Sequence, residues 1–275
     1  MRKKRFPAPP NDFATAGESR PSPGLQFISS TGRNPHLGAP KAGGPDPRDN
    51  RMLAALPPNE LAELAPHLEY VRLSQNQVLF DAGERIGSAY FITEGLVSLI
   101  TMLRSGMGVE IALMGKEGLP GFLCVLQPTI PTRVAVQLGG AAFRISAEEL
   151  RKAVRRNPTL DLLLRRFVGA LWTQAAQSVA CNRLHDLEQR LAKWLLLAQE
   201  RSGLSLIPLT HDYLAQLLGA GRSSVSLAAR ALEERGLIHY TRGRIKITNR
   251  VELEKAACEC YEVSRDAFQN LLESS

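Results

Sequence analysis

The stretch that decides the fold is PLTHDYLAQLLGAGRSSVSLAARALEERGLIHYTRGRIKI, residues 208–247. Its apolar residues recur at helical spacing on both sides of Gly219-Ala220-Gly221, a turn of the length that a helix-turn-helix requires. A first helix is predicted over about 210–218, and a second over about 222–235. Gly236 follows the second helix and is a typical residue to end it. The stretch therefore predicts two helices joined by a tight turn.

A β-hairpin is predicted directly after the second helix. Residues 237–240 (LIHY) and 244–247 (RIKI) are short strand-like runs, and Arg242-Gly243 marks the turn between them. Such a hairpin beside a helix-turn-helix is called a wing. Helix, turn, helix and hairpin together predict a winged helix-turn-helix.

The same stretch carries the chemistry for binding DNA. Val225, Ala229 and Leu232 share one face of the second helix and should pack inward, which leaves the opposite face to solvent. An α-helix fits the major groove of DNA, and its first turns reach the base edges. Seven basic and three acidic side chains lie within residues 210–250. The alternative is a plain three-helix bundle with a solvated arginine face. The residues predicted to contact DNA are Thr210, Arg222, Ser223, Ser224, Ser226, Leu227, Arg230, Arg242 and Arg244.

Composition narrows the class of protein. The chain of 275 residues can hold two domains and a tail, and its formal net charge of +7 favours a polyanionic partner. No apolar run approaches the length of a membrane span, and the basic N-terminus has no apolar signal-peptide core behind it. Four cysteines without a repeated spacing suit a reducing compartment. We therefore expect a cytoplasmic protein that does not bind membranes.

The N-terminal half is predicted to be an arm followed by a β-rich domain. Residues 1–50 are rich in proline and basic residues, so we expect a disordered basic arm. The arm either tethers DNA weakly or has no role. Residues 51–68 predict a short helix after Pro57-Pro58. Between residues 70 and 145, short β-rich runs are separated by glycines, which predicts a β-roll of about eight strands.

A long helix is predicted over residues 159–182. Its apolar stripe fits either burial against the β-rich domain or a dimer seam, and the seam is favoured because readers with one helix-turn-helix usually pair. The stripe contains Leu160, Leu164, Phe167, Leu171, Ala175 and Ser178. The expected fold class is α+β, organised as an arm (1–50), a β-roll sensor domain (51–150), a long dimerisation helix (151–185), a winged helix-turn-helix domain (186–250) and a helical tail (251–275).

At this point the layout resembles a known family. The stretches that carry the resemblance are FDAGERIGSAYFITEGLVSL (80–99), CNRLHDLEQRLAKWLLL (181–197) and residues 209–247. They resemble the Crp/Fnr family of bacterial transcription regulators over about residues 52–250. The resemblance implies a homodimer that binds a roughly palindromic double-stranded DNA operator, a jelly-roll-like double-stranded β-roll that senses a signal, and a long helix that relays it. RNA polymerase is a further partner that the family allows.

The resemblance also predicts how the DNA sequence is read. By position, Arg222 matches the first base-contacting arginine of the cyclic-AMP-responsive members. Ser223 stands where those members have a glutamate, and Leu227 stands where they have a second arginine. One of the three base-contacting residues is retained, so we expect a DNA half-site that differs from that of the cyclic-AMP-responsive members.

The expected ligand pocket departs from the family pattern. Cyclic-nucleotide sites in the family use Gly-Glu and, about ten residues later, Arg-Ser or Arg-Thr. The matching stretch here is GLPGFLCVLQPTIPTRVAV (118–136), in which Phe122 follows Gly121 and Val134 follows Arg133. A cyclic nucleotide is therefore not the expected ligand, and Arg133 is read as an ordinary charge at the rim of the core.

Other chemistry is weakly supported by the sequence. Family iron–sulfur sensors use cysteines near the N-terminus, and residues 1–123 contain none. Cys258-Glu-Cys260 is not a standard metal spacing, so these thiols are expected to be idle, with a redox or metal role as the alternative. No cofactor and no metal are assigned.

The motifs of common enzymes are missing from the sequence. We find no phosphate-binding glycine loop with lysine, no Gly-x-Ser-x-Gly and no His-Glu-x-x-His, so no catalytic residue is predicted. Two alternatives remain besides a regulator that does not bind cyclic AMP. One is a cyclic-nucleotide-responsive regulator with an atypical pocket, and the other is a constitutive DNA-binding protein whose β-roll is a scaffold.

Overall fold

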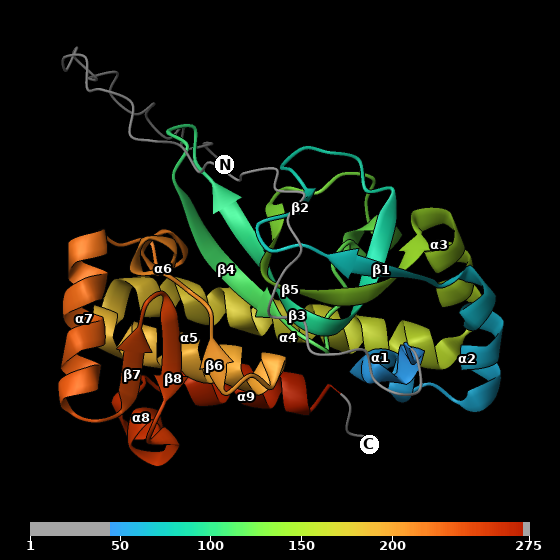
Figure 1. Cartoon of the computed structure of the whole chain (residues 1–275). Coiled ribbons are helices and arrows are strands. Elements are labelled where there is room, and N and C mark those ends of the chain that lie inside the picture. The colour runs from blue at the N-terminus through green and yellow to red at the C-terminus, as the bar shows by residue number, and fades with distance from the viewer. Residues whose placement is uncertain (1–44, 272–275) are drawn as a thin grey trace, which may run out of the picture.

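A computed structural model gives the fold of residues 45–271 (Figure 1). Most of the predicted arm, residues 1–44, lies outside this range, and its last residues, 45–50, are described. A short 3-10 helix, η1 (Pro47–Asp49), leads into Asn50, which is fully buried. The Asn50 amide donates hydrogen bonds to the carbonyl oxygens of Ile92 (2.9 Å) and Gly118 (3.1 Å), so the β-rich domain captures the end of the arm.

Two short helices and a further 3-10 helix precede the sheet. They are α1 (Arg51–Ala54), α2 (Pro58–Leu64) and η2 (Ala65–His67). The short helix predicted after Pro57-Pro58 is confirmed as α2, and Pro57, which cannot donate a backbone hydrogen bond, separates it from α1.

The β-roll contains five strands within residues 45–271, fewer than the eight or so predicted. They are antiparallel in the order β1-β5-β3-β4, and β2 also pairs with β5. Two of them are 15 and 14 residues long. The strands are β1 (Glu69–Leu73), β2 (Val78–Phe80), β3 (Ser88–Met102), β4 (Gly108–Met114) and β5 (Arg133–Ser146).

The strand count was overestimated because some glycines bend a strand and do not end it. Gly95 lies inside β3 with φ of +93°, and the register between β3 and β5 shifts on both sides of it. A Cβ at Gly140 of β5 would lie 2.0 Å from the Glu94 carbonyl oxygen, so the two backbones approach closely there. Each long strand curves at these glycines and continues.

The long helix packs its main apolar stripe against the β-roll. Helix α3 (Ala147–Arg156) begins at the Ser146 cap and leads into α4 (Pro158–Leu184). Leu160, Leu164, Phe167 and Leu171 of α4 are 0–5% exposed and belong to the core of the β-roll. The assignment of this stripe to a dimer seam is therefore wrong, and burial against the β-roll accounts for it.

The C-terminal half contains the predicted helix-turn-helix and wing. Helix α5 begins after a capping box at Asp186, and α6 begins after the Thr210 cap. The wing gains a short third strand, giving the order β6-β8-β7. The elements are α5 (Leu187–Ser202), β6 (Leu206–Ile207), α6 (His211–Leu217), α7 (Arg222–Glu234), β7 (Ile238–Thr241), β8 (Arg244–Ile247), α8 (Arg250–Ala256) and α9 (Cys260–Gln269).

One of the two hydrophobic cores is shared by the two halves. Leu96 and Leu113, on the outer side of the β-roll, pack with Leu195 of α5 in the same cluster that holds the helix-turn-helix. Figure 1 shows α4, α5 and α9 side by side beneath the β-roll, with α6 and α7 at one end. Across residues 45–271, no helix has the length and apolar character needed to span a membrane.

Candidate nucleic-acid interface

Helix α7 is held by its apolar face and presents the other face to solvent. Val225, Ala229 and Leu232 are 0–2% exposed and pack with α5 and α6. Gly219, with φ of +59°, makes the turn that brings α6 and α7 together. The core therefore fixes the orientation of α7, and the face opposite Val225 is exposed to solvent in the described part of the chain.

Arg222 occupies the first position of α7, with 70% of its side chain exposed. Its Nε lies 3.1 Å from Oδ1 of Asp212, whose side chain is also largely exposed. An ion pair in that setting contributes little, so Arg222 can exchange Asp212 for another acceptor at small cost. Ser223 and Ser224 are exposed beside it. The first turn thus offers one cation and two hydroxyl groups.

Ser226 is predicted to contact DNA, but the structure shows it bonded within the domain. Its hydroxyl donates to the Arg222 carbonyl oxygen (3.0 Å) and lies 3.0 Å from Nδ1 of His211. The His211 ring stacks on Tyr240 with 4.1 Å between ring centroids. Burial, with a smaller effect from Arg222, lowers the pKa of His211, so the neutral ring suits this place. Ser226 therefore joins α7 to α6 and the wing.

Leu227 and Arg230 extend the exposed face along α7. Leu227 is 69% exposed, which is a large apolar exposure for a helix that is otherwise anchored in a core. Arg230 pairs with Glu234 one turn later at 2.8 Å, and both side chains are largely exposed. The apolar Leu227 suits contact with a thymine methyl group or with a sugar, and Arg230 suits a phosphate.

The wing tip lies beside the start of α6. Arg242 and Gly243 have φ of +44° and +76°, the backbone of a tight hairpin turn. A Cβ at Gly243 would lie 3.5 Å from Cγ2 of Thr210, which caps α6 by accepting from the Tyr213 backbone N–H. Thr210, Arg242 and Arg244 are exposed together at this corner. The fold thus brings the predicted wing residues close to the start of the helix-turn-helix.

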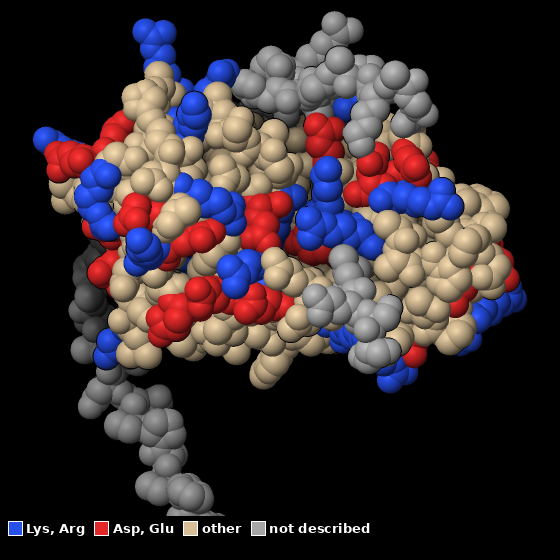
Figure 2. Space-filling model, turned by 90° about the horizontal axis from the view of Figure 1, so that it is seen from below, with Lys and Arg blue, Asp and Glu red and all other residues tan. Residues whose placement is uncertain are grey.

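The charges on another face of the molecule are mixed. Figure 2 views the side on which α8 and α9 lie at the bottom of Figure 1, and it shows acidic and basic side chains intermixed. Helix α8 carries two such pairs of opposite charge, Arg250–Glu254 (2.8 Å) and Lys255–Glu252 (2.6 Å). A surface of mixed sign does not attract a phosphate backbone strongly.

The three residues of the expected ligand pocket are used for packing and for one ion pair. Gly121 has φ of +86° and caps η3 (Phe122–Val125), and a Cβ there would lie 2.4 Å from the Ser88 carbonyl oxygen. Phe122 is 6% exposed and stacks edge-on against Phe167 of α4 at 5.3 Å. The position where the family carries its glutamate therefore joins the β-roll to the long helix.

Arg133 binds a carboxylate of its own domain. Its Nε and Nη2 donate to Asp81 at 3.1 and 2.7 Å, and this hydrogen bonding lowers the pKa of Asp81. Ile130, on the preceding loop, is 1% exposed and joins the same apolar core as Phe122. Two backbone hydrogen bonds hold this loop against residues 83–84. The loop that leads to Arg133 is thus anchored in the core by Ile130.

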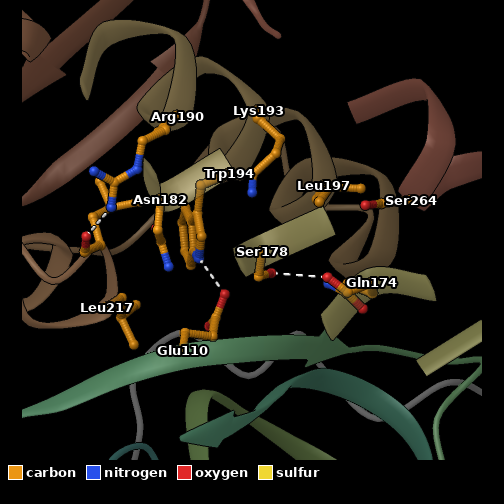
Figure 3. A pocket seen from close by; sticks show the side chains of 11 residues that line it. Glu110, Gln174, Ser178, Asn182, Arg190, Lys193, Trp194, Leu197, Leu217 and Ser264 are labelled. Atoms are coloured by element: carbon orange, nitrogen blue, oxygen red, sulfur yellow. Dashed lines mark hydrogen bonds between the residues drawn. The ribbon is translucent and has the colours of Figure 1, made fainter. Parts of the chain in front are cut away.

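Sequence reasoning missed a polar site between the two halves (Figure 3). Glu110 of β4 accepts hydrogen bonds from Trp194 Nε1 (2.9 Å) and from the Ser98 hydroxyl. Burial raises the pKa of Glu110 to about 7. Gln174 and Ser178 of α4, with Arg190 and Lys193 of α5, line the same hollow. The sequence signal was a single carboxylate in the apolar strand GVEIALMG (108–115), and its partners come from distant elements.

Comparisons with known proteins agree with this geometry. The cyclic nucleotide-binding domain family matches residues 70–157, and the Crp-like helix-turn-helix domain family matches residues 189–256. A global nitrogen regulator of Nostoc sp. is 22% identical over 191 residues, 66% of this chain and 86% of that protein. A CRP-like cAMP-activated global transcriptional regulator of Mycobacterium tuberculosis is 25% identical over 208 residues, 73% and 93% of the two chains. The structure of FixK2 from Bradyrhizobium japonicum aligns with a TM-score of 0.62 at 16% identity, covering 70% of this chain and 98% of that one.

Proposed function

The chain belongs to the Crp/Fnr family of DNA-binding transcription regulators, and from this premise we propose that it reads a two-fold symmetric DNA site as a homodimer. Its relatives are regulators and not enzymes, which confirms the expectation that it has no catalytic role. The observation that carries the proposal is the exposed first turn of α7, held rigidly from behind by the shared core.

Arg222 is the proposed base reader. Its guanidinium exchanges Asp212 for the N7 and O6 atoms of a guanine, a bidentate contact that contributes about 1–3 kcal/mol of discrimination. Ser223 and Ser224 lie next to it and can bond to a base or a phosphate. Leu227 gives an apolar contact one turn further along α7. Ser223 and Leu227 differ in chemistry from the base-contacting residues that the cyclic-AMP-responsive members have at these positions. The preferred DNA half-site therefore differs too.

Arg230 and the wing are proposed to bind the DNA backbone. Thr210, Arg242 and Arg244 lie together at the corner between wing and α6, on the flank of the recognition helix. Contacts of this kind fix the register of a protein on DNA but carry little sequence information. They also make the affinity fall steeply as salt rises.

The proposed dimer seam is the outward face of α4. Residues 162, 165, 169, 172, 176 and 179 alternate in steps of three and four, which is the spacing of a coiled-coil seam. Trp172 and Val179 are 75% and 73% exposed, and Leu162 is 47% exposed. Gly169 and Ala176 are small and exposed between them, so two helices can approach closely. A second copy of α4 would bury these apolar side chains.

Sedimentation equilibrium tests the seam. Trp172→Arg should turn the dimer into a monomer at micromolar concentration, because it places like charges across the two-fold axis. Leu126→Arg is the matched control, since Leu126 is 65% exposed but lies on the β-roll after η3. A Trp172→Arg protein that stays dimeric would place the seam elsewhere.

The proposed regulator does not respond to cyclic AMP. Two observations support this: Phe122 stands at the glutamate position and packs against Phe167, and Arg133 is bonded to Asp81. Isothermal calorimetry with cyclic AMP and cyclic GMP should show no binding at micromolar concentration, and a micromolar dissociation constant for either would overturn the point.

Selection from a random pool of duplex DNA tests the function as a whole. The full chain should enrich an inverted repeat whose half-sites lie about one helical turn apart. Recovery of the half-site of the cyclic-AMP-responsive members would reject the proposed role of Ser223 and Leu227. Enrichment of no motif would reject sequence-specific reading. RNA polymerase becomes a partner where the operator lies next to a promoter.

A further inference from the structure

Four potential metal ligands from two distant stretches meet at the end of α4. Cys181, His185, Cys258 and Cys260 each offer one ligand atom, and these atoms all lie within 4.8 Å of one another. Cys181 lies in the last turn of α4, and His185 is the C-cap residue whose backbone N–H donates to the Cys181 carbonyl oxygen, so the two residues are close together. Cys258 and Cys260 flank the start of α9, which runs alongside α4.

The spacing of the ligand atoms fits one tetrahedral ion. The Sγ atoms of Cys181 and Cys258 are 3.6 Å apart, and Sγ of Cys260 lies 3.6 Å from Nδ1 of His185. Zinc–sulfur bonds of about 2.3 Å in a tetrahedron place neighbouring ligand atoms roughly 3.8 Å apart. An iron–sulfur cluster distributes its ligands over several irons, so they lie farther apart. The geometry thus favours a mononuclear site.

The imidazole of His185 is already oriented as in a metal site. Its Nε2 lies 3.2 Å from Oε2 of Glu259, which leaves Nδ1 directed at the thiols. A carboxylate that accepts the second ring N–H fixes the tautomer and the ring plane, as it does for most histidines that bind metals. Glu259 sits between Cys258 and Cys260 in the sequence, so one short segment supplies two ligands and this support.

Burial and charge also suit an ion. The three cysteines are 0–3% exposed and form a cluster separate from the two apolar cores. The positively charged Lys193 of α5 lies near Cys181. A divalent ion with three thiolates carries one net negative charge, and the Lys193 ammonium offsets it. The donor set of three sulfurs and one nitrogen is soft, which selects zinc over magnesium or calcium.

We propose that Cys181, His185, Cys258 and Cys260 bind one zinc ion as a structural Cys₃His site. His185 ends α4 and Asp186 caps α5, so the ion would lie at the joint between the long helix and the DNA-reading half. It would also fasten the C-terminal segment to that joint. This proposal goes beyond the reading of DNA and does not depend on it. The cysteines looked idle in the sequence because the pairs are about 75 residues apart.

Metal analysis of the untagged full chain tests the proposal. Protein purified under reducing conditions without chelator should contain one zinc per chain by inductively coupled plasma mass spectrometry. Cys260→Ser and His185→Gln should lose it. Cys124→Ser and His67→Gln are the matched controls, since Cys124 is a buried thiol of the β-roll and His67 is a histidine of η2; both should keep it.

A second measurement is independent of the variants. Replacing zinc by Co²⁺ in the wild-type chain should give the visible absorption of a tetrahedral site and the ultraviolet bands of cobalt–thiolate bonds. Wild-type protein without zinc that gives no such spectrum would overturn the proposal, even if the variants fail to fold. Iron with inorganic sulfide in place of zinc would overturn the mononuclear assignment. Zinc that persists in His185→Gln and Cys260→Ser would overturn the location.

Discussion

Glu110 lies where β4 of the β-roll meets α5, and its replacement by glutamine should stabilise the protein above pH 7. Burial raises the pKa of Glu110 from 4.5 to about 7, and hydrogen bonds from Ser98 and Trp194 only partly oppose this. Each pH unit between the two values corresponds to about 1.4 kcal/mol, so ionising Glu110 in the folded protein costs about 3.5 kcal/mol more than in the unfolded chain. Residue Glu110 as a whole is only partly buried, and solvent near it reduces the expected gain to about 2 kcal/mol.

The sign of the pH dependence follows from proton binding. Between pH 4.5 and about 7, the folded chain holds the Glu110 proton while the unfolded chain has released it. The free energy of unfolding therefore falls as pH rises through this window, and it changes no further above it. Glutamine cannot ionise, yet its amide can still accept from Trp194 and donate to Ser98. The Glu110→Gln variant should lack this part of the pH dependence.

Urea unfolding at pH 5, 6, 7 and 8 measures the difference between wild type and variant. The free energy of unfolding of Glu110→Gln should exceed that of the wild type by less than about 1 kcal/mol at pH 5 and by about 2 kcal/mol at pH 8. Glu63→Gln, on the exposed surface of α2, is the control and should show a difference that does not vary with pH. A constant difference for Glu110→Gln, or a loss of stability at pH 8, would refute the reasoning.

Three further substitutions test how the chain holds its core. Arg201→Ala should lower the free energy of unfolding by about 3–5 kcal/mol, because it leaves Glu117 buried without the guanidinium 3.5 Å away; a loss below 1 kcal/mol in urea would contradict this. Asn50→Ala should cost about 2–4 kcal/mol, because two buried carbonyl oxygens lose their donor, and limited proteolysis near residue 50 should speed up; unchanged cleavage would count against it. Gly140→Ala should cost more than about 2 kcal/mol, since its Cβ would overlap the Glu94 carbonyl oxygen; a wild-type melting temperature would contradict the close approach.

The helix-turn-helix was predictable because its signals are local. The Thr210 cap, the glycine turn and Gly236 mark where helices begin and end within a few residues, and the structure places α6 and α7 within two residues of the predicted bounds. Helix caps and turns are determined by residues that are close in the chain, so they can be recognised from a single sequence.

The role of an apolar stripe on a helix depends on which part of the protein buries it, and a single sequence does not contain this information. The periodicity of α4 identifies an apolar stripe, but either the β-roll or a second chain could cover it. The stripe of Leu160 and Phe167 is the stronger pattern, and the β-roll buries it. The stripe that remains outward mixes Trp172 and Val179 with glycine, alanine and arginine, so it was not recognised.

The candidate metal site and the Glu110 site share another limitation. Each combines residues that are far apart in the chain, such as Cys181 with Cys258 and Glu110 with Trp194. Their spacing in sequence carries no signal, because only the packing of α4, α5 and α9 brings them together. For the predicted DNA contacts, the structure shows which side chains are exposed, and their roles stay predictions.

The most direct test of the central claim is a matrix of affinities for wild type and Arg222→Ala on the selected duplex and on duplexes with each base pair changed in turn. We predict that Arg222→Ala lowers the affinity for the selected duplex by about 5- to 150-fold for each half-site. We also predict that changing one particular base pair, the one that Arg222 contacts, no longer lowers the affinity of this variant, while changes at all other base pairs still do. Arg242→Ala, the control on the wing, should weaken all duplexes alike and reduce the salt dependence. If Arg222→Ala also weakens every duplex alike, or changes nothing, α7 does not read DNA through Arg222.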